Sequence, residues 1–360
     1  MRFLFACGGT AGHVNPAVGV AGRIRELLPE SEILFIGALG KMEMELVPRE
    51  GYEIRGVPVS NLSRSLSVEG IRHNIKFVSD LIKSGPACRK IIEEFQPDVV
   101  VGTGGYVCYP VLHEAAKLGI PTVVHESNAE PGLTTRQLEK CVDKIMVGFA
   151  EARENYKHPE KVVVTGTPVR LGFMRSDKSA ARRALGIAED EPLVVSVWGS
   201  LGATEMNKTV ARMIALAMDG AERPFRLVHS AGKRGIKSMT EYMSEELGLS
   251  DWKEAGFDVV DYIYDMPLLM AAADIVLCRS GASTLAELTA IGKPVYGIFI
   301  SLTRQILFLL PLIVIFPIFM GIDGVMYAGP IADVAAAVVC GVFTIKELRE
   351  LSRLNSQQTV

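Results

Sequence analysis

The first 165 residues alternate short apolar runs with amphipathic stretches. Short apolar runs bounded by turn residues are typical of strands buried on both faces, and alternating strands and helices predict a parallel sheet. The predicted strands are Phe3–Cys7, Ile33–Ile36, Val99–Val101, Thr122–His125, Lys144–Val147 and Val162–Val164. The predicted helices are Pro16–Leu28, Val68–Ile82 and Ala87–Phe95.

The same pattern restarts after the segment Gly166–Arg170, which contains a proline. The predicted strands of this half are Leu193–Trp198, Phe225–His229, Phe257–Val260 and Ile275–Leu277, and its helices include Asn207–Met218 and Ile236–Leu247. The α/β pattern therefore predicts two doubly wound, Rossmann-like domains that face a cleft. Ligands of such sheets bind beyond the carboxyl ends of the strands.

The composition changes near Tyr296. The run Ile306–Met320 contains neither charge nor glycine, Gly324–Phe343 is apolar except for Asp333, and charge returns only in Lys346–Arg353. We expect an apolar helical tail that is foreign to the second domain. The predicted domains are residues 1–165, 166–297 and 298–360.

Overall composition narrows the class of protein. Hydrophobic residues make up 49% and charged residues 22%, which is close to globular averages, and a net charge of −3 gives no reason to expect a nucleic-acid partner. The six cysteines form no C-x-x-C pair, so we expect reduced core thiols. Met1-Arg2 leads directly into a strand without a signal-peptide core, so we expect the first domain to stay in the cytosol.

Three glycine-rich loops each follow a predicted strand and precede a helical stretch: Gly8–His13, Gly102–Tyr106 and Gly199–Ala203. Glycine lets a backbone approach a phosphate, and a helix N-terminus offers free N–H groups. None of the loops has the P-loop or the dinucleotide-binding spacing. One such loop is explained equally well as a tight turn, but three in corresponding places favour phosphate binding.

The segment Arg279–Glu287 follows the strand Ile275–Leu277 and opens a helix with small residues. Its start leaves room for a diphosphate, and Glu287 could accept two hydrogen bonds from a ribose; the alternative is an ordinary acid on a helix surface. The chain has no Asp-x-Asp, so we expect no metal and no cofactor. Backbone amides, the helix dipole and Arg170 would then neutralise the diphosphate.

These motifs, in this order and spacing, resemble the MurG family of GT-B glycosyltransferases, which transfer GlcNAc from UDP-GlcNAc to lipid I to make lipid II. The matching segments are Gly8–Pro16, Gly102–Tyr106, His125–Gly132, Gly166–Arg170, Gly199–Ala203 and Arg279–Glu287. The resemblance covers roughly Met1 to Val295. It implies an inverting hexosyltransferase of peptidoglycan and cell-wall biosynthesis, and hence a part in cell shape and division.

The resemblance also implies a role for individual residues. The first domain would bind lipid I and the second UDP-GlcNAc. The implied acceptor-binding residues are Thr10, Gly12, Gly104, Gly105 and Asn128, and the implied donor-binding residues are Arg170, Ser200, Tyr262, Ile263, Ala282, Thr284 and Glu287. His13 is the candidate catalytic base; the alternative is a hydrogen-bond donor that orients the acceptor.

A lipid-linked acceptor requires contact with a membrane. The stretch Val68–Ser84 places basic residues beside apolar ones, which suits a helix lying on the anionic inner surface of the cell membrane. The apolar residues are Ile71, Ile75, Val78, Leu81 and Ile82, and the basic ones are Arg72, His73, Lys76 and Lys83. We therefore expect a peripheral protein on the cytoplasmic face; the alternative is an ordinary packed helix.

The resemblance ends at the tail. The family's His-Gln motif and returning C-terminal helix are missing after Val295, and residues 298–360 resemble the last two helices of a MATE-family exporter. Two helices cannot form a transport path, so the interpretation is a chimera with impaired transfer, and the alternative is a membrane anchor. The run Ile306–Met320 is shorter than the ~20 residues of a spanning helix. Other hypotheses are another GT-B enzyme, such as a glycolipid synthase or a UDP-GlcNAc 2-epimerase, and an inactive fusion.

Overall fold

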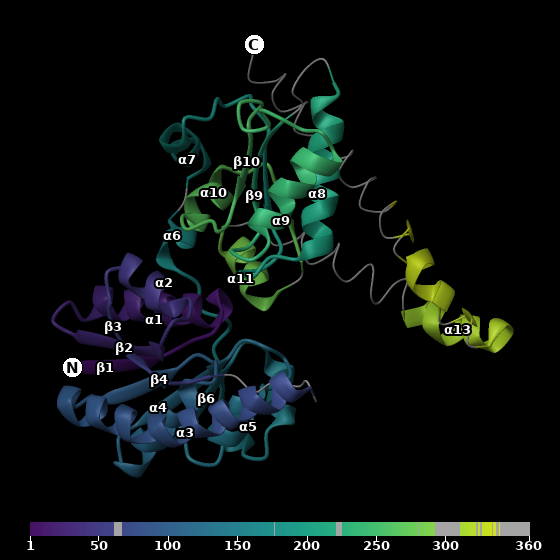
Figure 1. The fold of residues 1–360 in the computed structure, drawn as a ribbon. Coiled ribbons are helices and arrows are strands. Elements are labelled where there is room, and N and C mark those ends of the chain that lie inside the picture. Colours follow the sequence, from purple (N-terminus) through teal and green to yellow (C-terminus); the bar gives the residue numbers. More distant parts are fainter. Residues whose placement is uncertain are drawn as a thin grey trace. The chain divides into compact units, whose positions relative to one another are not determined.

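The structure is a computed structural model. It describes residues 1–60, 67–175, 177–220, 225–279, 281–291, 310–321, 323–324, 326–332, 334–335 and 338. The chain forms two compact units, Met1–Ile291 and Gly292–Val360. The first unit contains two parallel sheets, each with helices on both faces (Figure 1). We call the part around the first sheet the first lobe and the part around the second sheet the second lobe.

The first lobe is built on a seven-stranded parallel sheet in the order β3-β2-β1-β4-β5-β6-β7. Its strands are β1 (Arg2–Ala6), β2 (Glu32–Ala38), β3 (Glu53–Val57), β4 (Val99–Gly102), β5 (Thr122–Glu126), β6 (Lys144–Val147) and β7 (Val162–Val164). The chain starts in the middle of the sheet, runs to one edge and returns to the other side of β1. The carboxyl ends of β1 and β4 therefore diverge at the switch point where doubly wound sheets bind ligands.

Alternate residues of β1 pack into two different cores. Leu4 and Ala6 lie in one core with residues of α3 and α4, whereas Phe3 and Phe5 lie in the other with residues of α1. This follows from the period of two residues along a strand. The helices are α1 (Ala11–Leu27), α2 (Glu43–Arg49), α3 (Val68–Phe95), α4 (Cys108–Lys117) and α5 (Leu133–Leu138), with short 3₁₀ turns at Ala150–Asn155 and Pro159–Lys161.

The first lobe differs from the sequence prediction in α3 and β3, and its helices α2, α4 and α5 were not predicted. Helix α3 is continuous from Val68 to Phe95 and passes through Pro86, where two separate helices were predicted. An internal proline costs a helix roughly 3 kcal/mol, and here Cys88 and Ile92 bury the following turns against the sheet. Strand β3 was not predicted, because this edge strand contains no continuous apolar run like those of the other strands.

The second lobe is built on a four-stranded parallel sheet in the order β10-β9-β8-β11. Its strands are β8 (Leu193–Val197), β9 (Arg226–Ser230), β10 (Phe257–Val260) and β11 (Ile275–Cys278). Its helices are α6 (Leu171–Met174), α7 (Lys178–Leu185), α8 (Thr204–Met218), α9 (Ile236–Glu241), continued by a π-helical turn Tyr242–Glu246, α10 (Met266–Ala272) and α11 (Ala282–Ala290). The two parallel α/β sheets confirm the predicted fold class.

A buried arginine ties one face of the second lobe together. Arg182 of α7 is fully buried and donates to the carbonyls of Ala272 and Ala188, at 3.0 Å and 2.6 Å. It also donates to Asp274 Oδ2 at 3.0 Å, and Asp274 in turn accepts from the Leu193 amide at 2.8 Å. The guanidinium thus connects α7, α10 and the start of β8.

The second unit is described only in part. Its α13 (Leu310–Met320) is apolar throughout, and residues 326–332 form another helical stretch. No helix in the described part of the chain is both long and apolar enough to cross a membrane. The rest of the predicted apolar tail, including most of Gly324–Phe343, lies outside the described residues.

We predict that Arg182→Ala lowers the free energy of unfolding by about 1–3 kcal/mol, because the Ala272 and Ala188 carbonyls lose their buried donor. Asp274 keeps its hydrogen bonds from Lys178 and the Leu193 amide. The neighbouring Arg183 is exposed on the same helix, so Arg183→Ala is the matched control. Denaturant unfolding of both variants measures the difference. Equal stability of the two variants would show that the Arg182 network contributes nothing.

Candidate active site

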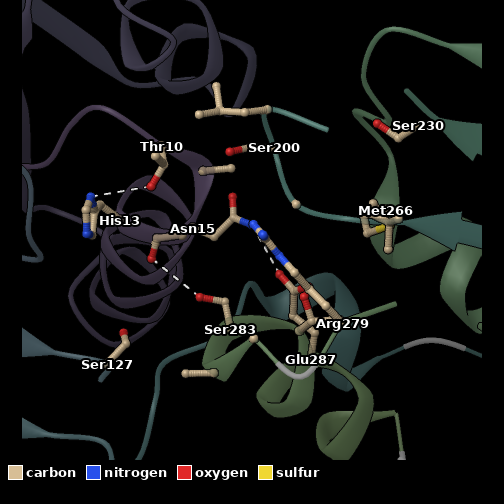
Figure 2. A pocket seen from close by; sticks show the side chains of 18 of the residues that line it. Thr10, His13, Asn15, Ser127, Ser200, Ser230, Met266, Arg279, Ser283 and Glu287 are labelled. Carbon is tan, nitrogen blue, oxygen red and sulfur yellow. Dashed lines mark hydrogen bonds between the residues drawn. The ribbon is translucent and has the colours of Figure 1, made fainter. Parts of the chain in front are cut away.

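A cavity of about 280 Å³ opens where the glycine loops of the two lobes meet (Figure 2). It brings together most of the residues that the sequence predicted as ligands. Those that line it are Thr10, Gly12, His13, Asn128, Arg170, Ser200, Tyr262, Ile263, Ala282, Thr284 and Glu287. The cavity is therefore the candidate active site.

His13 lies in the first turn of α1 and faces the cavity. Its Nδ1 is 2.8 Å from the Gly8 carbonyl oxygen. Because a carbonyl can only accept, Nδ1 carries the proton and Nε2 keeps a free lone pair. The hydroxyl of Thr103 donates to the His13 carbonyl at 2.6 Å and holds this turn of backbone.

The second glycine loop supports the first from behind. Gly8 N donates to the Gly104 carbonyl at 3.2 Å, and a Cβ on Gly105 would lie 2.2 Å from the Gly8 oxygen. A Cβ on Gly104 would lie 2.5 Å from the His13 ring. Neither Gly104 nor Gly105 lines the cavity. Their position next to His13 shapes the loop, and their predicted contact with an acceptor stays a prediction.

A buried carboxylate organises the loop that carries Asn128. Glu126, at the end of β5, accepts from the Asn128 side chain at 2.7 Å and from its backbone amide at 3.1 Å. The Thr135 hydroxyl donates to the other Glu126 oxygen at 2.8 Å. Asn128 is thereby held at the cavity from the first lobe. Glu126 lies in the segment His125–Gly132 that resembles the family, but it was not predicted as a functional residue.

The second lobe presents the start of α11 to the cavity. Gly281, Ala282 and Thr284 line it there, where the first amides of the helix have no partners within the helix. Arg279 also lines the cavity and was missed as a ligand. Gly199 has φ +96, and a Cβ there would lie 2.2 Å from an Arg279 nitrogen. The sequence signal that could have identified Arg279 is a cation directly after a predicted strand and next to a glycine-containing segment.

Arg170 adds a second cation to this side. Its Nη1 donates to Glu50 Oε1 at 2.8 Å and to the Tyr264 carbonyl at 3.4 Å. Its Nε is buried and has no hydrogen-bond partner among the described residues. Burial raises the pKa of the nearby Tyr262 to about 12, so this phenol stays neutral.

Glu287 is almost fully buried at the cavity and accepts from Asn15 Nδ2 at 3.1 Å. Burial raises the pKa of its carboxyl to about 7, while Arg170 and the Asn15 hydrogen bond act in the opposite direction. The alternative of an ordinary acid on a helix surface is wrong. In the described part of the chain no cluster of His, Cys, Asp or Glu could hold a metal ion.

Comparisons with known proteins identify the family of the chain. The sequence profile of the glycosyltransferase family 28 N-terminal domain matches residues 3–147, and that of its C-terminal domain matches residues 193–305. The chain belongs to glycosyltransferase family 28. The second match extends past Val295, where the resemblance was predicted to end, into residues that the structure does not describe.

One relative within this family is the Alkaliphilus oremlandii protein named UDP-N-acetylglucosamine--N-acetylmuramyl-(pentapeptide) pyrophosphoryl-undecaprenol N-acetylglucosamine transferase. It is 43% identical over 293 residues, which are 81% of this chain and 77% of that protein.

Solved structures support the family fold alone. Anabaena HepE in complex with UDP-glucose has a TM-score of 0.52 and 13% identity over 81% of this chain and 79% of that chain. The Neisseria meningitidis UDP-GlcNAc 2-epimerase bound to UDP-GlcNAc has a TM-score of 0.51 and 14% identity over 78% of each chain.

We predict that Glu287→Gln raises the free energy of unfolding at pH 8 by about 1–3 kcal/mol and leaves it unchanged near pH 4.5. The raised pKa means that the neutral carboxyl stabilises the fold below pH 4.5, and that this stabilisation is lost as the pH rises through about 7. A glutamine stays neutral and can keep the Asn15 bond.

Thermal unfolding at the two pH values measures this effect. Glu205→Gln, at an exposed glutamate of α8, is the control. A Glu287→Gln chain with wild-type stability at both pH values would contradict the prediction.

Proposed function

We propose that the chain is an inverting N-acetylglucosaminyltransferase that moves GlcNAc from UDP-GlcNAc to the MurNAc 4-hydroxyl of lipid I. The observation that carries the proposal is a single cavity that joins an imidazole with a free Nε2 to the N-terminus of α11. The name of the 43%-identical relative specifies the same donor and acceptor. The product would be lipid II of peptidoglycan biosynthesis.

In this reaction His13 acts as the general base. As the acceptor oxygen bonds to the anomeric carbon, its proton moves to His13 Nε2 and the bond to UDP breaks. The hydrogen bond from Nδ1 to Gly8 supports this role over that of a donor, because it leaves Nε2 as the acceptor. Stabilisation of the departing diphosphate is the other requirement.

The second lobe binds the donor. The α11 N-terminus, Ser200 and Arg170 line the same cavity, and together they would neutralise the diphosphate without a metal. Arg279 adds a further charge. The remaining assignments follow the family resemblance: Ala282 and Thr284 at the diphosphate, Glu287 at the ribose, Tyr262 over the uracil and the Ile263 backbone at its edge.

The first lobe binds the lipid acceptor. Thr10, Gly12 and Asn128 line the cavity on that side, whereas Gly104 and Gly105 do not line it and would act by shaping the loop beside His13. We place the chain peripherally on the anionic cytoplasmic face of the cell membrane, with α3 as the contact. Arg72, Ile75 and Lys83 of α3 are exposed, as such a contact requires. The side chains of Ile71, His73, Lys76, Val78, Leu81 and Ile82 lie outside the described residues.

The tail stands apart from this function. We propose residues 1–165 as the acceptor domain, 166–297 as a shortened donor domain and 298–360 as a foreign tail of the kind that ends MATE-family exporters. The described α13 carries only apolar residues and offers no hydrogen-bonding group for a sugar. Transfer by the full chain is therefore expected to be slow.

An epimerase is the second candidate of the same fold. Its chemistry removes and returns a proton on the sugar, which calls for carboxylates around the sugar. Glu287 is the only carboxylate among the described residues that line the cavity, and it is held by Asn15. The transferase therefore explains the site better.

We predict that His13→Gln lowers kcat for GlcNAc transfer by about 10²–10⁴-fold, because a base in proton transfer contributes that much. The affinity for UDP should stay within a factor of about two, since removing a group on the acceptor side spares donor binding. Transfer of radiolabelled GlcNAc to a lipid I analogue gives kcat, and calorimetry gives the UDP affinity. His158→Gln, which changes an exposed histidine, is the control. A wild-type kcat in His13→Gln would show that His13 is not the general base.

We predict that replacing residues 296–360 with the C-terminal segment of the Alkaliphilus relative raises the transfer rate by at least about tenfold and moves the protein into the soluble fraction. An apolar helix such as α13 favours aggregation or membrane association when nothing covers it. Equal solubility and equal turnover of the natural and grafted chains would show that the tail is neither foreign nor disabling.

A further inference from the structure

A buried carboxylate behind the first glycine loop has no part in the site described so far. Glu43, the first residue of α2, is fully buried and forms no ion pair among the described residues. Its Oε2 accepts from Gly9 N at 2.9 Å and its Oε1 from Ala38 N at 3.0 Å. A Cβ on Gly8 would lie 2.5 Å from Oε1, so the glycine makes room for the charge.

The amide that donates to Glu43 belongs to the same peptide group that His13 contacts. The Gly9 N–H points to the carboxylate, and the Gly8 carbonyl accepts from His13 Nδ1 at 2.8 Å. A negative charge at the N–H end of a peptide group draws its dipole into line and makes the carbonyl oxygen a stronger acceptor. Carboxylate, peptide group and imidazole therefore form one continuous chain of hydrogen bonds.

We propose that Glu43 is a positioning residue that acts on His13 through the Gly8–Gly9 peptide group. It keeps the proton on Nδ1 and stabilises the imidazolium that forms when Nε2 takes a proton. The proton stays on the imidazole, as it does where an aspartate orients a catalytic histidine. The catalytic consequence rests on the proposed transferase function, but the effect on the imidazole does not.

The other titratable groups around the first glycine loop do not form this chain of hydrogen bonds to His13. Cys7 of β1 and Cys108 of α4 lie behind it, and burial raises the pKa of both thiols, so they are neutral. Glu126 contacts the Asn128 loop instead. Across the cavity lie Arg170, Arg279 and Glu287, which belong to the second lobe. Glu43 is the carboxylate that is hydrogen-bonded to the peptide group next to His13.

Histidine-selective ¹⁵N NMR of the full-length chain tests the proposal without requiring activity. The signal of His13 is assigned by its loss in His13→Gln. In the wild type we expect the Nδ1–H tautomer. In Glu43→Gln we expect an upfield shift of the His13 Nδ1 proton. We also expect the midpoint of the His13 pH titration to fall by at least about half a unit, because a nearby negative charge has been removed. An Nε2–H tautomer in the wild type would overturn the proposal.

Two further variants separate this effect from simple disruption. Glu139→Gln removes another buried carboxylate of the first lobe, which accepts from the His158 amide at 2.7 Å, and should leave the His13 signal unchanged. Glu43→Asp keeps the charge and should keep the midpoint close to that of the wild type; it also serves if Glu43→Gln does not fold. A midpoint that drops as far in Glu43→Asp as in Glu43→Gln would assign Glu43 a purely structural role.

Kinetics then connect the effect to transfer. We expect Glu43→Gln to lower kcat by about 10–100-fold, as loss of a group that supports a catalytic ligand does, with KM for UDP-GlcNAc changed less than about twofold. An unchanged kcat beside a shifted midpoint would overturn the catalytic part. Absence of transfer by the wild type would count against the proposed function, while the NMR result would still decide the role of Glu43.

Discussion

The close packing of backbone on backbone at the carboxyl ends of β1 and β4 is the constraint on which the acceptor side depends. Gly105 leaves no room for a Cβ beside the Gly8 carbonyl, and Gly104 leaves none beside the His13 ring. This contact holds the Gly8 oxygen where it accepts from His13. A side chain at either position would separate the loops and release the imidazole, so these glycines shape the site from behind.

The glycine loops of the second lobe are packed backbone against backbone in a similar way. Gly202 and Gly232 meet backbone to backbone after β8 and β9: a Cβ on Gly232 would lie 2.2 Å from the Leu201 oxygen. Gly199 lies against the guanidinium of Arg279. The loops can therefore follow the strand ends closely, and the N-terminus of α11 stays open to the cavity. Both lobes thus bring glycine loops to the cavity.

Contacts between the lobes lie both in the site and outside it. Asn15 of α1 donates to Glu287 of α11, and Tyr264 donates to Glu45 of α2 at 2.7 Å. Arg49 lies 3.8 Å from the centre of the Tyr264 ring. Glu287 of the second lobe is thus bonded to the first lobe. Burial raises the pKa of its carboxyl to about 7.

The sequence by itself determined the two parallel sheets, because strands buried on both faces must be apolar runs, and it located the glycine loops that surround the cavity. It also identified half of the residues that line the cavity through the family resemblance. Only the tertiary structure decided that α3 continues through Pro86. It also decided that Glu43 lies behind His13, that Arg279 lies against Gly199 and that Glu287 bonds to Asn15. These three contacts join residues far apart in the chain, and local patterns carry no information about which distant side chain will fill a given space.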